Sequence, residues 1–90
     1  MSAALFPLGQ TVITRNAMDS LVPEDVQTCL NRHVSGDWGD LNDEDREENS
    51  LALTQGLRLF SVYRDRANVK FYIITEHDRS VTTVLLPEDY

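Results

Sequence analysis

The 90-residue chain contains a single cysteine, Cys29, and a single lysine, Lys70. One cysteine cannot form an internal disulfide, and no Cys/His spacing resembles a zinc site. Eight Lys and Arg residues against 15 Asp and Glu residues give a formal net charge of −7. Binding to nucleic-acid phosphates or to an anionic membrane requires clustered basic residues, so neither is expected. The charge balance instead favours a basic protein partner or mimicry of a polyanion.

Long apolar segments are also missing. The first eight residues have no basic n-region, and Pro7 breaks their short apolar run, so they do not resemble a signal peptide. No stretch approaches the roughly 18 apolar residues of a membrane span. We therefore expect a cytoplasmic protein. The length and the hydrophobic content of 41% predict one domain, residues 1–90.

The N-terminal segment predicts an arm, a strand and a short helix. Residues 1–9 form the arm, and β-branched residues predict a strand over residues 10–15. Asn16 can then cap a helix of one to two turns over residues 17–21. Three apolar residues are available to dock the arm: Leu5, Phe6 and Leu8.

Two longer helices follow, each with clear start and stop signals. Pro23 suits the first position of one helix, and Gly36 can take the left-handed conformation that ends it. Asn42 caps the next helix, which runs to Gln55 and stops at Gly56. The first of these two helices carries an apolar stripe at helical spacing: Val22, Val26, Cys29, Leu30, His33 and Val34.

From Leu57 the hydrophobic period changes to two, which is typical of strands. Residues 57–64, 69–76 and 81–86 predict a three-stranded antiparallel meander with short hairpin connections. The fold class is therefore α+β, two or three N-terminal helices followed by the meander, to which the N-terminal strand can be added. Both faces of the meander carry apolar residues, and the helices can cover only one. The arm and N-terminal strand, or a second copy in a homodimer, would cover the other.

The densest charge lies in residues 33–49, where seven acidic residues surround one base, Arg46. Frames starting at Asp37 or Asp40 lack the glycine that a calcium-binding EF-hand loop needs at its sixth position. We therefore expect a hydrated acidic surface without metal or cofactor. The interaction candidates are Asp37, Trp38, Asp40, Asp43, Glu44, Asp45, Glu47 and Glu48.

Two clusters offer an alternative polar site. His33 with Asp37 can form a histidine–carboxylate pair, although a half-packed histidine at a helix end explains the same residues. The second cluster, His77, Asp78, Arg79 and Ser80, contains acid, base and nucleophile types but lies in one predicted hairpin loop. Catalytic triads are assembled in space rather than along a turn, so we expect Asp78 to bond its own backbone there.

The only tryptophan, Trp38, lies between two glycines of the acidic stretch, Gly36 and Gly39. It can fold back over the small core or project as an anchor for a partner. The core role is the preferred interpretation. No catalytic residues are assigned, because no nucleophile elbow, phosphate-binding glycine loop or Cys–His signature is present.

Three blocks of the sequence are distinctive: HVSGDWGD at residues 33–40, GLRLFSVY at residues 56–63 and ITEHDRSVTTVLLP at residues 74–87. With these blocks the chain resembles a family of small bacterial proteins found on plasmids and integrated elements. The resemblance covers nearly the whole chain after Gly9. It implies the company of conjugation, restriction and anti-defence genes, and it brings no catalytic residues.

Three functional hypotheses follow. The first is a non-enzymatic accessory protein of a mobile element that binds a basic, nucleic-acid-handling protein through its acidic surface, with anti-restriction, anti-defence or DNA-mimic action. The second is a small enzyme or ligand-binding domain with a site around His33, Asp37 and Asp40, which requires a pocket joining residues 36–41 to the sheet. The third is self-association through the second face of the sheet.

Overall fold

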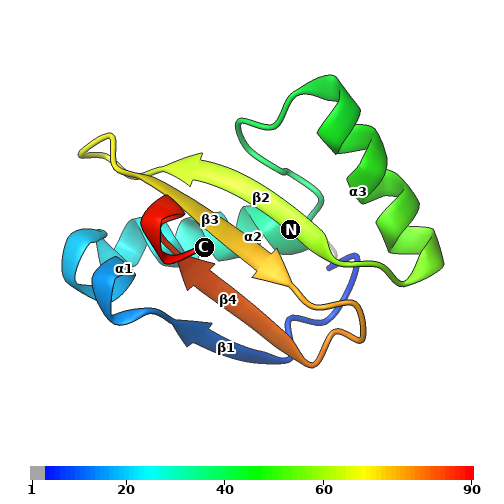
Figure 1. The fold of residues 1–90 in the computed structure, drawn as a ribbon, viewed down its shortest axis with the longest axis horizontal. Coiled ribbons are helices and arrows are strands. Elements are labelled where there is room, and N and C mark those ends of the chain that lie inside the picture. The colour runs from blue at the N-terminus through cyan, green and yellow to red at the C-terminus, as the bar shows by residue number, and fades with distance from the viewer. Residues whose placement is uncertain (1–3) are drawn as a thin grey trace.

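Four strands form one mixed sheet in the computed structural model, which describes residues 4–90 (Figure 1). Their spatial order is β1-β4-β3-β2. The predicted antiparallel meander of β2, β3 and β4 is confirmed, but the sheet has a fourth strand, β1, which pairs in parallel with β4. The strand bounds are β1 Gln10–Ile13, β2 Leu59–Arg64, β3 Lys70–Thr75 and β4 Val81–Leu85.

Three α-helices lie between β1 and β2, and their bounds are α1 Arg15–Ser20, α2 Pro23–Val34 and α3 Asp43–Gln55. The caps expected for the two longer helices are confirmed, since Pro23 begins α2 and the Asn42 side chain caps α3. The start of α1 differs from the prediction because Thr14 is its cap, accepting from the Ala17 N–H at 3.2 Å. Within residues 4–90, no helix combines the length and apolar content needed to cross a bilayer.

Helices α1 and α2 cover one face of the sheet, and α2 crosses behind the strands in Figure 1. The strand residues that face α2 alternate with residues that face away, as the pleat requires. Burial of their side chains against the helical stripe forms the main core. Its members are Ala17, Leu21, Val26, Cys29, Leu30, Tyr63, Phe71, Ile73, Val84 and Leu86.

The opposite face of the sheet carries Phe60, Tyr72, Ile74 and Leu85 and has no α-helix over it (Figure 1). The short 3₁₀ helix η1 (Pro87–Asp89) packs against β3, and the Tyr90 ring that follows it lies 6.0 Å from the Tyr72 ring. We call this face the open face of the sheet.

The described part of the N-terminal arm, residues 4–9, does not cover the open face, contrary to one of the expected arrangements. Of its apolar residues, Phe6 is buried, Leu8 is half-buried and Leu5 is exposed. The Phe6 ring stands edge-on to His33, with ring centroids 5.2 Å apart, so the arm packs at the C-terminal end of α2. Residues 4–9 of the arm therefore complete the core, and Ile74 and Leu85 of the open face are buried without them.

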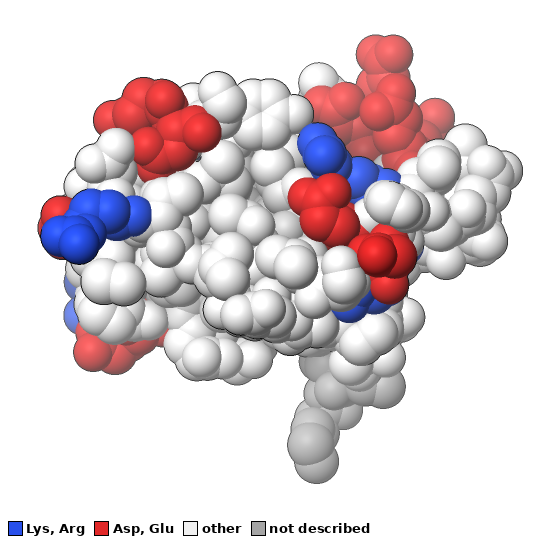
Figure 2. Space-filling view, turned by 60° about the horizontal axis from the view of Figure 1, so that its bottom comes forward, with Lys and Arg blue, Asp and Glu red and all other residues white. Residues whose placement is uncertain are grey.

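The two edges of the sheet differ. The outer edge of β2 pairs with the chain at Gly39, because the Asp40 N–H donates to the Val62 carbonyl at 2.8 Å and the Val62 N–H donates to the Trp38 carbonyl. Strand β1 forms the other edge, and within residues 4–90 no strand pairs with its outer side. Figure 2 brings this side forward and shows an uncharged area in its middle, bordered by charged groups.

Candidate functional site

Helix α3 stands beside the sheet at the edge of β2 (Figure 1). Its buried Asn49 side chain forms the two backbone bonds that a neighbouring strand would form with Phe60. The side-chain amide donates to the Phe60 carbonyl at 2.7 Å, and the side-chain oxygen accepts from the Phe60 N–H at 3.2 Å. Ala52 lies on the same side of α3 and is also buried. One narrow face of α3 is thus fixed to β2, and the remainder faces solvent.

The bonds between Asn49 and Phe60 predict that an Asn-to-Asp substitution has different effects at Asn49, within α3, and at Asn42, which caps it. Asn49→Asp removes the donor to the Phe60 carbonyl and should lower the free energy of unfolding by about 2 kcal/mol. Asn42→Asp adds the same charge but keeps the acceptor that caps α3, so it should change stability by less than about 0.5 kcal/mol. Urea midpoints of both variants measure the difference, and equal midpoints would contradict the assigned role of Asn49.

Arg46, the only base within the acidic stretch, forms no ion pair with a carboxylate of residues 4–90. Its Nε donates to the Leu41 carbonyl at 3.0 Å, and its terminal nitrogen donates to the Gly39 carbonyl at 2.6 Å. The guanidinium therefore holds residues 39–41 against the start of α3. Within residues 4–90, none of the ion pairs includes a carboxylate of α3.

The interaction candidates separate into two groups. Asp37 is bound by Arg32 at 2.8 Å, which holds the pKa of the Asp37 carboxyl below its usual range, and Asp40 lies 3.8 Å from the Arg64 guanidinium. Trp38 is only 5% exposed, so the structure places it in the core, stacked on Phe6. Among the interaction candidates, the carboxylates without an ion pair are those on α3: Asp43, Glu44, Asp45, Glu47 and Glu48.

His33 does not belong to a polar surface site. It is fully buried. Its Nδ1 lies 2.5 Å from the Ser61 hydroxyl, and its Nε2 lies 2.9 Å from the Thr75 hydroxyl. The Thr75 hydroxyl is in turn bonded to the Thr82 hydroxyl, which donates to the Leu8 carbonyl. The carbonyl only accepts, so each hydroxyl along this chain of hydrogen bonds donates toward it and Nε2 must carry the proton. Burial, with a smaller effect of Arg79, lowers the pKa of His33 from 6.5 to about 4. The ring is therefore neutral near neutral pH and holds α2 to the sheet.

The hairpin cluster also stabilises the fold. Asp78 accepts from the Ser80 N–H at 3.0 Å and from the Ser80 hydroxyl at 2.6 Å, which is the local bonding expected of it. Arg79 points away from this loop and donates to three carbonyls, those of Leu57, Glu76 and Ala52. It thereby ties the β3–β4 hairpin to the end of α3.

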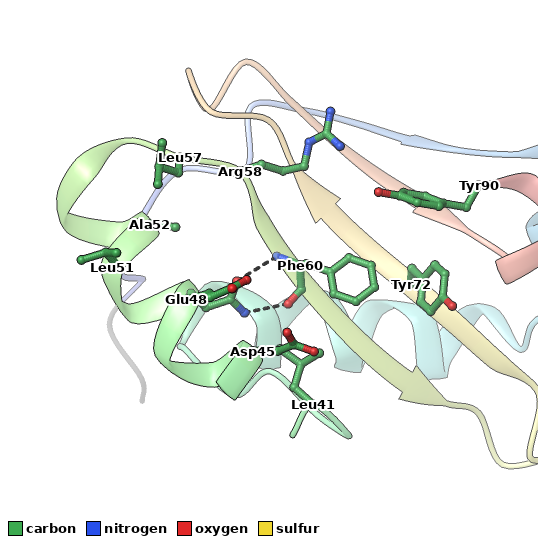
Figure 3. Close-up of a pocket in the computed structure, with 11 residues that line it drawn as sticks. Leu41, Asp45, Glu48, Leu51, Ala52, Leu57, Arg58, Phe60, Tyr72 and Tyr90 are labelled. Atoms are coloured by element: carbon green, nitrogen blue, oxygen red, sulfur yellow. Dashed lines mark hydrogen bonds between the residues drawn. The ribbon is translucent and has the colours of Figure 1, made fainter. Parts of the chain in front are cut away.

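A groove between α3 and the open face of the sheet was not anticipated. Its larger part has a volume of about 540 Å³, and Figure 3 shows α3 on one side and the aromatic rings of the sheet on the other. The Phe60 and Tyr72 rings form the floor, with centroids 4.9 Å apart. The residues lining this part are Leu41, Asp45, Glu48, Asn49, Leu51, Ala52, Leu57, Arg58, Phe60, Tyr72 and Tyr90.

A second depression of about 300 Å³ extends this groove along β2. It shares Leu41, Asp45, Phe60 and Tyr72 with the larger part. Asp40 lines it, so a pocket does join the 36–41 segment to the sheet, as the ligand-binding hypothesis requires. Of the three residues named in that hypothesis, Asp40 lines the second depression, whereas the buried His33 and Asp37 line neither part.

Nothing in residues 4–90 brings three or more metal-ligating side chains together. Cys29 is buried on the α2 stripe, and burial raises the pKa of its thiol, which disfavours the reactive thiolate. Family models, curated proteins and solved structures gave no match. The functional argument therefore rests on the carboxylates of α3 and on the adjoining groove.

Proposed function

We propose that this protein acts by binding a basic protein partner through the acidic surface of α3, and not by catalysis. The observation that carries the proposal is the absence of ion pairs to the α3 carboxylates within residues 4–90. The nearest base, Arg46, is held by two carbonyls. Helix α3 carries five carboxylates against the single positive charge of Arg46, and this excess of negative charge on a helix attached by one narrow face attracts a cationic surface.

Two polar residues of the alternative site, His33 and Arg79, have structural roles, which supports binding over catalysis. His33 is buried as a neutral ring, and Arg79 is held by three carbonyls. Both contribute to packing, so neither is available to a substrate. The proposal extends to a nucleic-acid-handling partner, because a surface built for phosphates also suits a row of carboxylates. The sequence resemblance adds a biological context to the proposal: the protein would be an anti-restriction or anti-defence accessory protein of a mobile element.

A charge-matched pair of triple variants tests the proposal. We define the outer ridge of α3 as Asp43, Glu44 and Glu47, which are exposed and lie outside the groove. Asp43→Asn, Glu44→Gln and Glu47→Gln together should weaken binding to a purified histone-like, basic DNA-binding protein by about tenfold at low salt, at roughly 0.5 kcal/mol per charge. Isothermal titration calorimetry measures this loss.

The control triple variant removes the same number of charges elsewhere: Asp19→Asn, Glu24→Gln and Glu88→Gln, all at exposed positions. It should bind as the unmodified protein does. Raising the ionic strength from roughly 0.05 M to roughly 0.15 M should weaken the binding of the unmodified protein, because exposed charges are screened. Binding that ignores salt, or that falls equally in both triple variants, would contradict the proposal.

A further inference from the structure

Exposed apolar side chains are concentrated around the groove between α3 and the sheet. Large exposed apolar residues in 4–90 are Leu5, Val12, Met18, Leu51, Leu57 and Tyr90. Half of them line the larger part of the groove: Leu51 is 50% exposed, Leu57 is 47% exposed and Tyr90 is 73% exposed. An exposed apolar cluster around a concave site with an aromatic floor is typical of an interaction surface.

The larger part of the groove carries an excess of negative charge on its helix side, whereas the second depression is lined by Arg64 and Lys70 as well as by Asp40 and Asp45. Figure 3 shows Asp45 and Glu48 on α3, facing the aromatic floor of the sheet. Within residues 4–90 neither of these carboxylates is in an ion pair. Arg58, the only base lining the larger part, pairs with Glu76 at 3.2 Å, outside the larger part. An occupant that brings a cation to Asp45 and Glu48 and an apolar group to the leucines therefore complements the larger part.

We propose that the groove binds an extended segment of the partner protein in which an apolar side chain is followed closely by Lys or Arg. The apolar side chain inserts between Leu51, Leu57 and the Phe60 ring, and the cation meets Asp45 and Glu48. This inference rests on the proposed function and adds an apolar anchor to it. The outer ridge attracts the basic partner, and the groove selects the segment that docks.

The shape of the groove favours a polypeptide segment over a compact ligand. The larger part is bordered by exposed leucines, and the second depression extends it along β2 past Asp40. A chain can follow both parts, whereas a compact ligand would fill one and leave the other empty. None of arm residues 4–9 lines the groove, since Phe6 is buried against His33 and Trp38.

The test uses short fluorescein-labelled peptides of serine and glycine that contain one leucine followed by two arginines. One matched peptide replaces the leucine with serine, and another replaces both arginines with glutamine. Fluorescence anisotropy should show binding of the first peptide and at least about tenfold weaker binding of each matched peptide. Amide chemical shifts should change around the lining residues of α3 and β2.

Two pairs of exposed leucine or methionine residues provide matched variants. Leu51→Ser with Leu57→Ser should weaken peptide binding by about tenfold, since each substitution removes an apolar side chain that contributes roughly 0.7 kcal/mol to binding. Leu5→Ser with Met18→Ser removes comparable exposed apolar surface away from the groove and should leave binding unchanged. Circular dichroism checks that all four substitutions preserve the fold.

The outcomes separate this inference from the proposed function. If the outer-ridge variant loses the basic protein but the Leu51/Leu57 variant binds peptide normally, the groove inference is wrong and the proposed function stands. If the outer-ridge variant keeps the basic protein, the proposed function is wrong, whatever the leucine variant does. Concentration-dependent dimers in sedimentation that vanish in the Leu51/Leu57 variant would show that a second copy occupies the groove, which also overturns the inference.

Discussion

Replacing Gly39 with alanine is expected to lower the free energy of unfolding by about 3 kcal/mol. Gly39 has φ +74°, a conformation that costs an alanine about 1 kcal/mol. A Cβ atom there would overlap the Val62 carbonyl oxygen and lie 2.7 Å from the Tyr63 ring. The segment must move away from β2, which breaks the backbone bonds that cover this edge and disturbs the buried Trp38.

Gly56→Ala is the matched control. Gly56 ends α3 at φ +67°, and an added Cβ would meet no atom within 4 Å. Only the conformational cost applies, so this variant should lose about 1 kcal/mol. Thermal and urea unfolding followed by far-UV circular dichroism compares the two variants. Equal losses would mean that the contact between Gly39 and β2 is not tight.

Stability is expected to fall by about 2 kcal/mol as the pH drops from about 7 to about 4.5, because His33 is buried without charge. The pKa of His33 is about 4 in the folded protein against 6.5 in an unfolded chain. Between these values the unfolded chain binds a proton that the folded protein excludes, so the free energy of unfolding decreases with decreasing pH. Carboxyl groups with lowered pKa, such as Asp37, add their own loss only at lower pH.

Urea unfolding at a series of pH values, followed by the fluorescence of Trp38, measures this dependence. The exposed His77 provides the control, because His77→Gln should leave the pH dependence unchanged. Nitrogen-15 NMR of the histidine side chains should show His33 as one neutral tautomer with the proton on Nε2, even at about pH 5.5. A stability that stays constant over this range, or a slope that disappears in His77→Gln, would refute the role assigned to His33.

The sequence predicts the longer helices well because their signals are local. Pro23, Asn42 and Gly56 each impose a backbone preference at their own position, and the structure places the helix boundaries there. The parallel pairing of β1 with β4 could not be predicted, since it joins Gln10 to Val81 across most of the chain. β-branched residues indicate that a strand forms, but they do not indicate its neighbour.

In the candidate site, too, the features set by local sequence were predictable and those set by long-range contacts were not. The acidic surface was predictable because hydration of many neighbouring carboxylates requires no tertiary information. The groove was not, because it depends on Asn49 fixing one face of α3 to β2, and a single asparagine in a helix carries no signal for such a contact. The burial of His33 did have a signal: Ser61, Thr75 and Thr82 are polar residues on the strand face that packs against α2.

The unequal edges of the sheet limit how molecules of this protein could polymerise. Growth into a fibre by strand addition needs two free edges per molecule, and the Trp38–Asp40 segment and Asn49 already occupy one of them. Antiparallel joining of β1 to the β1 strand of another molecule would use the remaining edge of both. Assembly by that route would end at two molecules, even though β1 carries no charged residue to discourage it.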